Sequence, residues 1–157
     1  MLTDFLKLLE TLDSYNVDFV VVGGLAAVAH GSSQVTQDID ICINLNPKNM
    51  DRLEASLKEL HPIHRIGNKQ HPFTETGNTL YSLKNIYLTT DYGQLDCLGE
   101  IKGIGNYSQV LINSFKLPID GKEYNFLTLD ALIEAKKAIN RPKDKESVII
   151  LEALREK

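Results

Sequence analysis

Two aspartates lie one residue apart in the apolar segment DIDICI, at residues 38–43. Side chains alternate between the two faces of a strand, so a strand here would place Asp38 and Asp40 on one face and the three isoleucines on the other. The two carboxylates would then lie about 6–7 Å apart and repel each other. A divalent cation removes this repulsion, and Mg²⁺ usually binds one or two carboxylates together with substrate phosphates. The spacing therefore predicts a metal site.

A third carboxylate can be added from the segment GQLDCLG, at residues 93–99. In a strand, Asp96 would point to the face opposite Leu95 and Cys97. If this strand lies beside residues 38–43, Asp96 completes a group of three carboxylates. Such a group can hold two ions about 4 Å apart, an arrangement that activates an attacking hydroxyl and stabilises a leaving pyrophosphate.

Gly23 and Gly24 lie between an apolar strand at residues 18–22 and an Ala-rich helix at residues 25–30. Because glycine has no side chain, a phosphate can approach this backbone closely, and the N–H groups of residues 24–26 at the positive end of the helix can bind it. A tight turn is the simpler alternative for Gly-Gly, as chance is for an Asp-x-Asp pair. The order of the two motifs, thirteen residues apart, favours a triphosphate site beside a metal site.

A local excess of positive charge follows later in the chain. Residues 136–145 hold five basic residues and one acidic residue, although the whole chain has a net charge of −4. We expect Lys136, Arg141 and Lys143 to contact the triphosphate. For each of them a solvated helix face is an equal alternative.

The remaining composition is that of an ordinary folded domain. With 157 residues, 43% of them hydrophobic, the chain is long enough for one domain, residues 1–157, with a substantial core. The net negative charge argues against bulk binding to nucleic acid or to anionic membranes. No apolar run approaches the length of a membrane span, and the start of the chain lacks a secretory pattern, which predicts a cytoplasmic protein.

The cysteines and histidines do not predict a second metal site. Cys42 and Cys97 are expected to be reduced thiols. His61, His64 and His71 lie close together in the sequence, but we find no cysteine or acidic partner that completes a four-ligand zinc set.

Hydrophobic periodicity, caps and turns predict a mixture of helices and strands. Helices are expected at residues 3–15, 25–30, 46–60, 128–140 and 143–155, and strands at residues 18–22, 38–43, 80–90 and 94–98, with a further hairpin around Asp120-Gly121. For residues 61–79 the sequence predicts only a strand fragment and a polar loop. This order predicts an α+β fold, in which a mixed sheet of about four to six strands is packed with helices, two of them C-terminal.

The motifs Val22-Gly23-Gly24 and Asp38-Ile39-Asp40-Ile41, followed by Asp96, resemble the signature of the nucleotidyltransferase superfamily of the DNA polymerase beta type. The segment Arg141-Pro142-Lys143-Asp144 is similar to one that is frequent in small bacterial members. Short members of this kind include lincosamide nucleotidyltransferases and nucleotidyltransferase-type toxin or antitoxin proteins. One residue departs from the pattern, because many members have Ser where this chain has Gly24.

The resemblance implies a nucleotidyltransferase-like sheet and an enzyme that moves a nucleoside monophosphate from an NTP to an acceptor hydroxyl. It implies that two Mg²⁺ ions, or Mn²⁺, bind to Asp38, Asp40 and Asp96, and that Asp96 takes the acceptor proton. The nucleotide-binding residues implied are Gly23, Gly24, Lys136, Arg141 and Lys143.

The resemblance leaves the acceptor open, since a small molecule, a protein or an RNA would each supply a hydroxyl. It also leaves an alternative from another class. The chain could be a non-catalytic or regulatory module of a toxin–antitoxin type system, acting as a homodimer or with a cognate protein partner.

Overall fold

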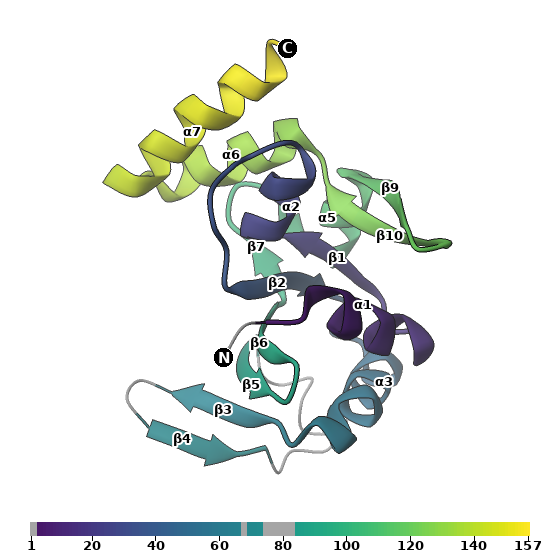
Figure 1. Ribbon diagram of the computed structural model, residues 1–157. Coiled ribbons are helices and arrows are strands. Elements are labelled where there is room, and N and C mark those ends of the chain that lie inside the picture. The colour runs from purple at the N-terminus through teal and green to yellow at the C-terminus, as the bar shows by residue number, and fades with distance from the viewer. Residues whose placement is uncertain (1–2, 67–68, 74–83) are drawn as a thin grey trace.

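The computed structural model describes residues 3–66, 69–73 and 84–157. Its centre is a mixed sheet of eight strands in the order β4-β3-β5-β6-β2-β1-β10-β9. In chain order these strands are β1 (Phe19–Val22), β2 (Asp38–Ile43), β3 (Ile63–Ile66), β4 (Lys69–Pro72), β5 (Asn85–Thr90), β6 (Gly93–Leu98), β9 (Ser114–Ile119) and β10 (Lys122–Leu127). A two-stranded ribbon of β7 (Glu100–Ile101) and β8 (Gly105–Asn106) follows β6 (Figure 1).

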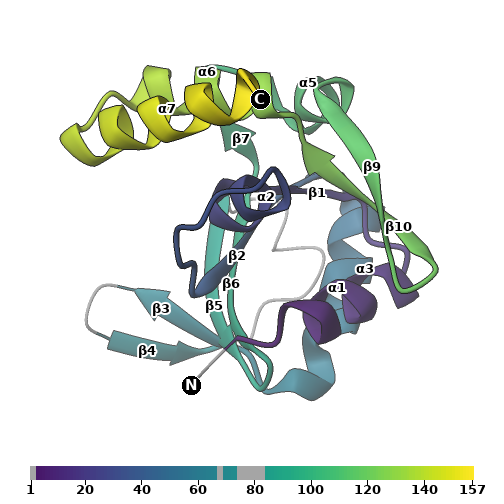
Figure 2. The same cartoon turned by 45° about the horizontal axis from the view of Figure 1, so that its top comes forward.

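The helices form two pairs and two short connectors. They are α1 (Phe5–Ser14), α2 (Gly23–Ala29), α3 (Pro47–Leu57) with the 3₁₀ turn η1 (Lys58–Leu60), α5 (Tyr107–Ile112), α6 (Leu129–Ile139) and α7 (Pro142–Arg155). Helices α1 and α3 pack together near one end of the molecule, and α6 and α7 pack together at the other end (Figure 2). No helix within the described ranges is long and apolar enough to cross a membrane.

Local signals explain where the helices begin. The Asn46 side chain accepts a hydrogen bond from the Asn49 backbone N–H at 2.8 Å, and Pro47 occupies the first turn of α3. Thr128 caps α6 through the Ala131 N–H at 3.3 Å. These are the helix starts that the sequence predicts.

The strand alternation that the sequence predicts is confirmed in the centre of the sheet. Ile39 and Ile41 of β2 and Leu95 and Cys97 of β6 are completely buried in the core. Because β2 pairs with β6 in parallel, the alternate residues of both strands share the other face. This other face carries the aspartates.

The fold class predicted from the sequence is confirmed, with more strands than the four to six expected. The additional strands come mainly from residues 61–79, where β3 and β4 form a hairpin beside β5. Helix α5 and the β7–β8 ribbon were not predicted. The first residues of the expected strand at 80–90 lie outside the described residues, and β5 begins at Asn85.

Candidate functional site

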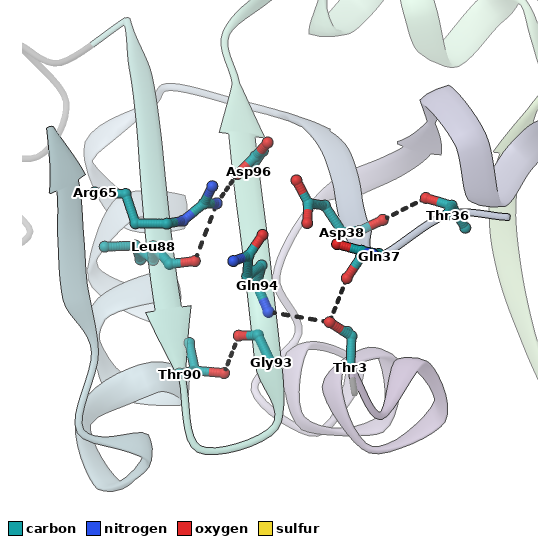
Figure 3. A network of polar contacts seen from close by, with 10 residues as sticks. All are labelled: Thr3, Thr36, Gln37, Asp38, Arg65, Leu88, Thr90, Gly93, Gln94 and Asp96. Atoms are coloured by element: carbon teal, nitrogen blue, oxygen red, sulfur yellow. Dashed lines mark hydrogen bonds and ion pairs between the residues drawn. The ribbon is translucent and has the colours of Figure 1, made fainter. Parts of the chain in front are cut away.

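The three aspartates lie on one face of the sheet, and two of them share a row. Strand register places Asp40 of β2 directly opposite Asp96 of β6, while Asp38 lies opposite Gln94. Figure 3 shows the Asp38 carboxylate directed toward β6, on the same face as Asp96. The predicted grouping of three carboxylates on one face therefore corresponds to the observed register.

Burial raises the pKa values of two of these carboxylates, those of Asp40 and Asp96. The pKa of Asp40 rises from 3.8 to about 7, first because the group is buried and then because of the charge of Asp96, a hydrogen bond with Asp96 and the charge of Asp38. Lys136 acts in the opposite direction. Burial also raises the pKa of Asp96, against the opposing effect of Arg65. In the fold alone, negative charge at this site is therefore unfavourable.

Gly23 leaves the space that the Asp40 carboxylate occupies. Gly23 has φ of +64°, and a Cβ atom there would collide with Asp40 Oδ2. A Cβ atom on Gly24 would lie 2.7 Å from the hydroxyl oxygen of Thr36, which itself donates to the Asp38 carbonyl at 3.1 Å. Each glycine therefore has a local packing role beside the aspartates. Their expected contact with phosphate stays a prediction.

A pocket of about 310 Å³ opens beside Asp40 and Gly23. Its other lining residues come from the ends of β1, β6 and β10, from the segment after β6, from α6 and from the residue before α7: Val22, Leu98, Glu100, Ile101, Lys102, Leu127, Leu132, Ala135, Lys136, Ile139 and Arg141. Most of this lining is apolar, and it includes three cations, Lys102, Lys136 and Arg141, and one further carboxylate, Glu100. Two of them, Lys136 and Arg141, are residues expected to bind nucleotide. Lys143, the remaining basic residue expected to bind nucleotide, does not line this pocket.

The cations Lys136 and Arg141 are held by an aspartate to which the sequence analysis gave no role. Asp144 is completely buried; its Oδ2 atom accepts from Arg141 Nε at 2.6 Å, and its Oδ1 atom lies 3.3 Å from Lys136 Nζ. The hydrogen bonds from Arg141 hold the pKa of Asp144 well below its usual range. The three-residue spacing of Arg141 and Asp144 at a helix start was the available signal.

A second residue that the sequence analysis missed lies on the opposite side of the carboxylates. Arg65 of β3 donates from Nη2 to Asp96 Oδ1 and to the Leu88 carbonyl, the latter at 3.3 Å (Figure 3). Arg65 places a cation on this side of the carboxylates. It could not be found from the sequence because residues 61–79 gave no strand register.

The donor chemistry of the site fits a divalent cation in part. Asp40 and Asp96 are adjacent carboxylates, and carboxylate oxygens are the ligands that Mg²⁺ prefers. However, within residues 3–66, 69–73 and 84–157 no three His, Cys, Asp or Glu side chains are gathered closely enough to hold a metal ion as they stand. The expected three-carboxylate metal group therefore shares a face but does not converge on one point.

The histidines near the site have other partners. His30 ends α2, and its Nε2 atom lies 2.9 Å from the Leu127 carbonyl. His61 is exposed and pairs with Asp91 at 2.7 Å, which raises the pKa of His61. The side chain of His71 lies outside the described residues.

Comparison with known proteins supports the fold. No protein-family model and no curated protein matches this chain. Among solved structures, it is similar to one from Thermotoga maritima that is described as a "putative nucleotidyltransferase", with a TM-score of 0.60 and 16% sequence identity. The match covers 100% of this chain and 97% of the other. The chain therefore has a nucleotidyltransferase-like fold.

Proposed function

We propose that this protein is a Mg²⁺-dependent nucleotidyltransferase, which transfers a nucleoside monophosphate from an NTP to an acceptor hydroxyl. The observation that carries the proposal is the position of Asp40. Its carboxylate lies beside a second carboxylate, Asp96, and on the wall of a pocket with an apolar side and a basic rim. A nucleoside triphosphate has the matching chemistry, an apolar base with a strongly anionic tail.

The pocket divides naturally between these two parts of a nucleotide. Leu132, Ala135 and Ile139 of α6 supply an apolar wall for the base, while Lys136 and Arg141 supply positive charge for the phosphates. Asp144 keeps both cations in place, since it contacts each of them. This arrangement orients the α-phosphate toward Asp40.

The carboxylates would hold the metal and accept the proton. Asp38 and Asp40 are the residues that would bind Mg²⁺, which neutralises phosphate charge and polarises the reacting oxygens when it is bound. The acceptor oxygen attacks the α-phosphorus, the bond to the β-phosphate oxygen breaks, and pyrophosphate leaves. The hydroxyl proton passes to Asp96, because burial raises the pKa of this carboxyl and makes it a better base.

One observation favours a second candidate, a non-catalytic or regulatory module with the same fold. The three carboxylates do not converge within the described residues, and Arg65 already binds Asp96. A nucleotide-binding module without turnover needs the pocket and its basic rim but not a complete metal site. The toxin–antitoxin role named as an alternative in the sequence analysis belongs to this second candidate.

The test is transfer of label from the nucleotide. Each of the four NTPs, labelled on the α-phosphate, is incubated with Mg²⁺ and cell lysate, and the labelled product is separated into protein, RNA and small molecules. We expect one fraction to be labelled by the wild type and not by Asp40→Asn. Label from the γ-phosphate instead would indicate phosphoryl transfer. If no NTP labels any fraction, yet Mg²⁺-NTP raises the Tm, the non-catalytic candidate replaces the enzyme.

A further inference from the structure

The position of Arg65 raises a question about how many metal ions the site can hold. Strand β3 is two strands away from β6, and the Arg65 side chain crosses β5 to reach Asp96 (Figure 3). Extending the β3–β5 register by one residue places Arg65 opposite Tyr87, and Tyr87 lies opposite Asp96. Arg65, Tyr87, Asp96 and Asp40 therefore form one row across four neighbouring strands.

The pair of Arg65 and Asp96 is shielded from solvent. The exposed fractions of the two side chains are 26% and 15%, compared with 48% and 77% for the surface pair of Arg155 and Asp130. Shielded ion pairs are weakened less by water and salt than exposed pairs. The second bond of Arg65, to the Leu88 carbonyl, fixes the guanidinium in this position.

Arg65 also changes the charge balance of the site. Three ionised aspartates carry three negative charges, and Arg65 supplies one positive charge directly on Asp96. A single divalent cation on the remaining two aspartates would then neutralise the group. A second divalent ion at Asp96 would have to displace the guanidinium or lie next to it, and like charges at that distance repel.

We propose that Arg65 takes the place of a second divalent cation, and this inference rests on the proposed function. The Arg65 guanidinium neutralises Asp96 and holds its carboxylate, so that the site binds one divalent ion through Asp38 and Asp40. Arg65 is thus a positioning residue for Asp96. This differs from the two-ion site that the sequence resemblance implies.

The test counts bound Mn²⁺ by electron paramagnetic resonance of the free ion, with no nucleotide present. We expect the wild type to bind one Mn²⁺ and Arg65→Gln to bind two, with the second ion at least tenfold tighter than any second ion on the wild type. Arg65→Lys keeps the charge and should bind one. Arg155→Gln, which removes a surface guanidinium of the same kind, is the matched control and should also bind one.

A second measurement does not depend on the folding of Arg65→Gln. If Arg65 withholds Asp96 from the metal, Asp96→Asn should leave Mn²⁺ affinity within about threefold of wild type, whereas Asp38→Asn or Asp40→Asn should lose the ion. A wild type that binds two ions, or an Asp96→Asn variant that loses its ion, would overturn the role of Arg65 and leave the proposed function standing. Absence of Mn²⁺ binding to the wild type would also overturn the role of Arg65, whereas the proposed function would fall only if no NTP labels any fraction in the transfer experiment.

Discussion

Asp40 and Asp144 are two shielded carboxylates in different surroundings: Asp40 lines the pocket, whereas Asp144 is buried against two cations that line it, Lys136 and Arg141. Asp144 accepts hydrogen bonds from Lys136, from the Arg141 side chain and from the Arg141 backbone N–H at 3.1 Å. Asp40 faces two other carboxylates, those of Asp38 and Asp96. The pKa of Asp144 is lowered, whereas that of Asp40 is raised to about 7.

The difference separates a carboxylate that stabilises the fold from one that needs a ligand. Donors around Asp144 compensate for its lost hydration, so its negative charge is favourable in the folded state. Around Asp40 the neighbouring carboxylates have the same charge sign as its own, and the charge of Lys136 opposes them only in part. The Mg²⁺ ion of the proposed function would supply the missing positive charge. Each prediction below tests one side of this contrast.

The largest effect on stability is expected from Asp144→Asn. The change leaves two cations beside a buried amide that cannot neutralise them, so the Tm should fall by roughly 10 °C. Asp130→Asn is the matched control, because Asp130 pairs with Arg155 in an exposed position, and its Tm should stay within about 2 °C of wild type. Circular dichroism melts measure both. Equal losses in the two variants would show that Asp144 is not the anchor of this region.

The next effect is that of a methyl group at Gly23. Gly23→Ala adds a Cβ atom at φ of +64°, where it also collides with the Asp40 carboxylate. We expect a loss of about 3 kcal/mol in the free energy of unfolding, from backbone strain and overpacking together. Denaturant titration measures this loss.

Gly121→Ala separates the two causes. Gly121 has φ of +82°, but no atom lies within 4 Å of a Cβ placed there. This variant should therefore show the backbone cost alone, about 1–2 kcal/mol. A Gly23→Ala variant that loses no more free energy of unfolding than Gly121→Ala does would show that a Cβ atom on residue 23 does not collide with the Asp40 carboxylate. The close packing of these two residues would then be wrong.

Part of the site could be predicted from local patterns in the sequence. The alternation in DIDICI and GQLDCL predicts the faces of β2 and β6, because one face of each strand must be buried. That prediction is sufficient to group Asp38, Asp40 and Asp96, and the register confirms it. Helix caps such as Asn46 and Thr128 are also predictable, because a cap depends only on residues that are close in the sequence.

Contacts between distant segments could not be predicted in this way. Arg65 meets Asp96 only because β3 lies beside β5 in the sheet, an order that no local pattern in residues 61–79 encodes. The role of Asp144 depends on Lys136, eight residues earlier on another helix. Periodicity in the sequence predicts which face of a strand a residue occupies. The tertiary fold decides which cation contacts that residue.

Neutralising Asp40 should stabilise the protein when metal is removed with EDTA. Because the folded-state pKa, about 7, lies above the ordinary value of 3.8, the folded protein keeps a proton that the unfolded chain releases in this interval. Wild-type stability is therefore lost as the pH rises from about 4 to about 7. Asp40→Asn lacks this loss and should exceed wild type by about 2 kcal/mol at pH 8.

Denaturant titrations at pH 5 and pH 8 in EDTA provide the measurement. The advantage of Asp40→Asn should be small at pH 5 and largest at pH 8, and added Mg²⁺ should stabilise only the wild type. For Asp144 the dependence has the opposite sign, because a lowered pKa contributes stability that is lost on acidification. An Asp40→Asn variant that is less stable than wild type at pH 8 would make Asp40 a structural residue like Asp144.

The smallest effect, and the finest test of the pocket, compares two neighbouring cations. Arg141 lines the pocket and contacts Asp144, whereas Lys143 is exposed and does not line it. Arg141→Ala should weaken binding of a fluorescent NTP with Mg²⁺ about tenfold, which corresponds to one charge-assisted contact. Lys143→Ala should change the affinity less than twofold, although it removes the same charge two residues away. The titration is made well below the Tm, since Arg141→Ala also removes a partner of Asp144. Equal weakening by both variants would mean that general positive charge attracts the nucleotide, and that the pocket wall does not position it.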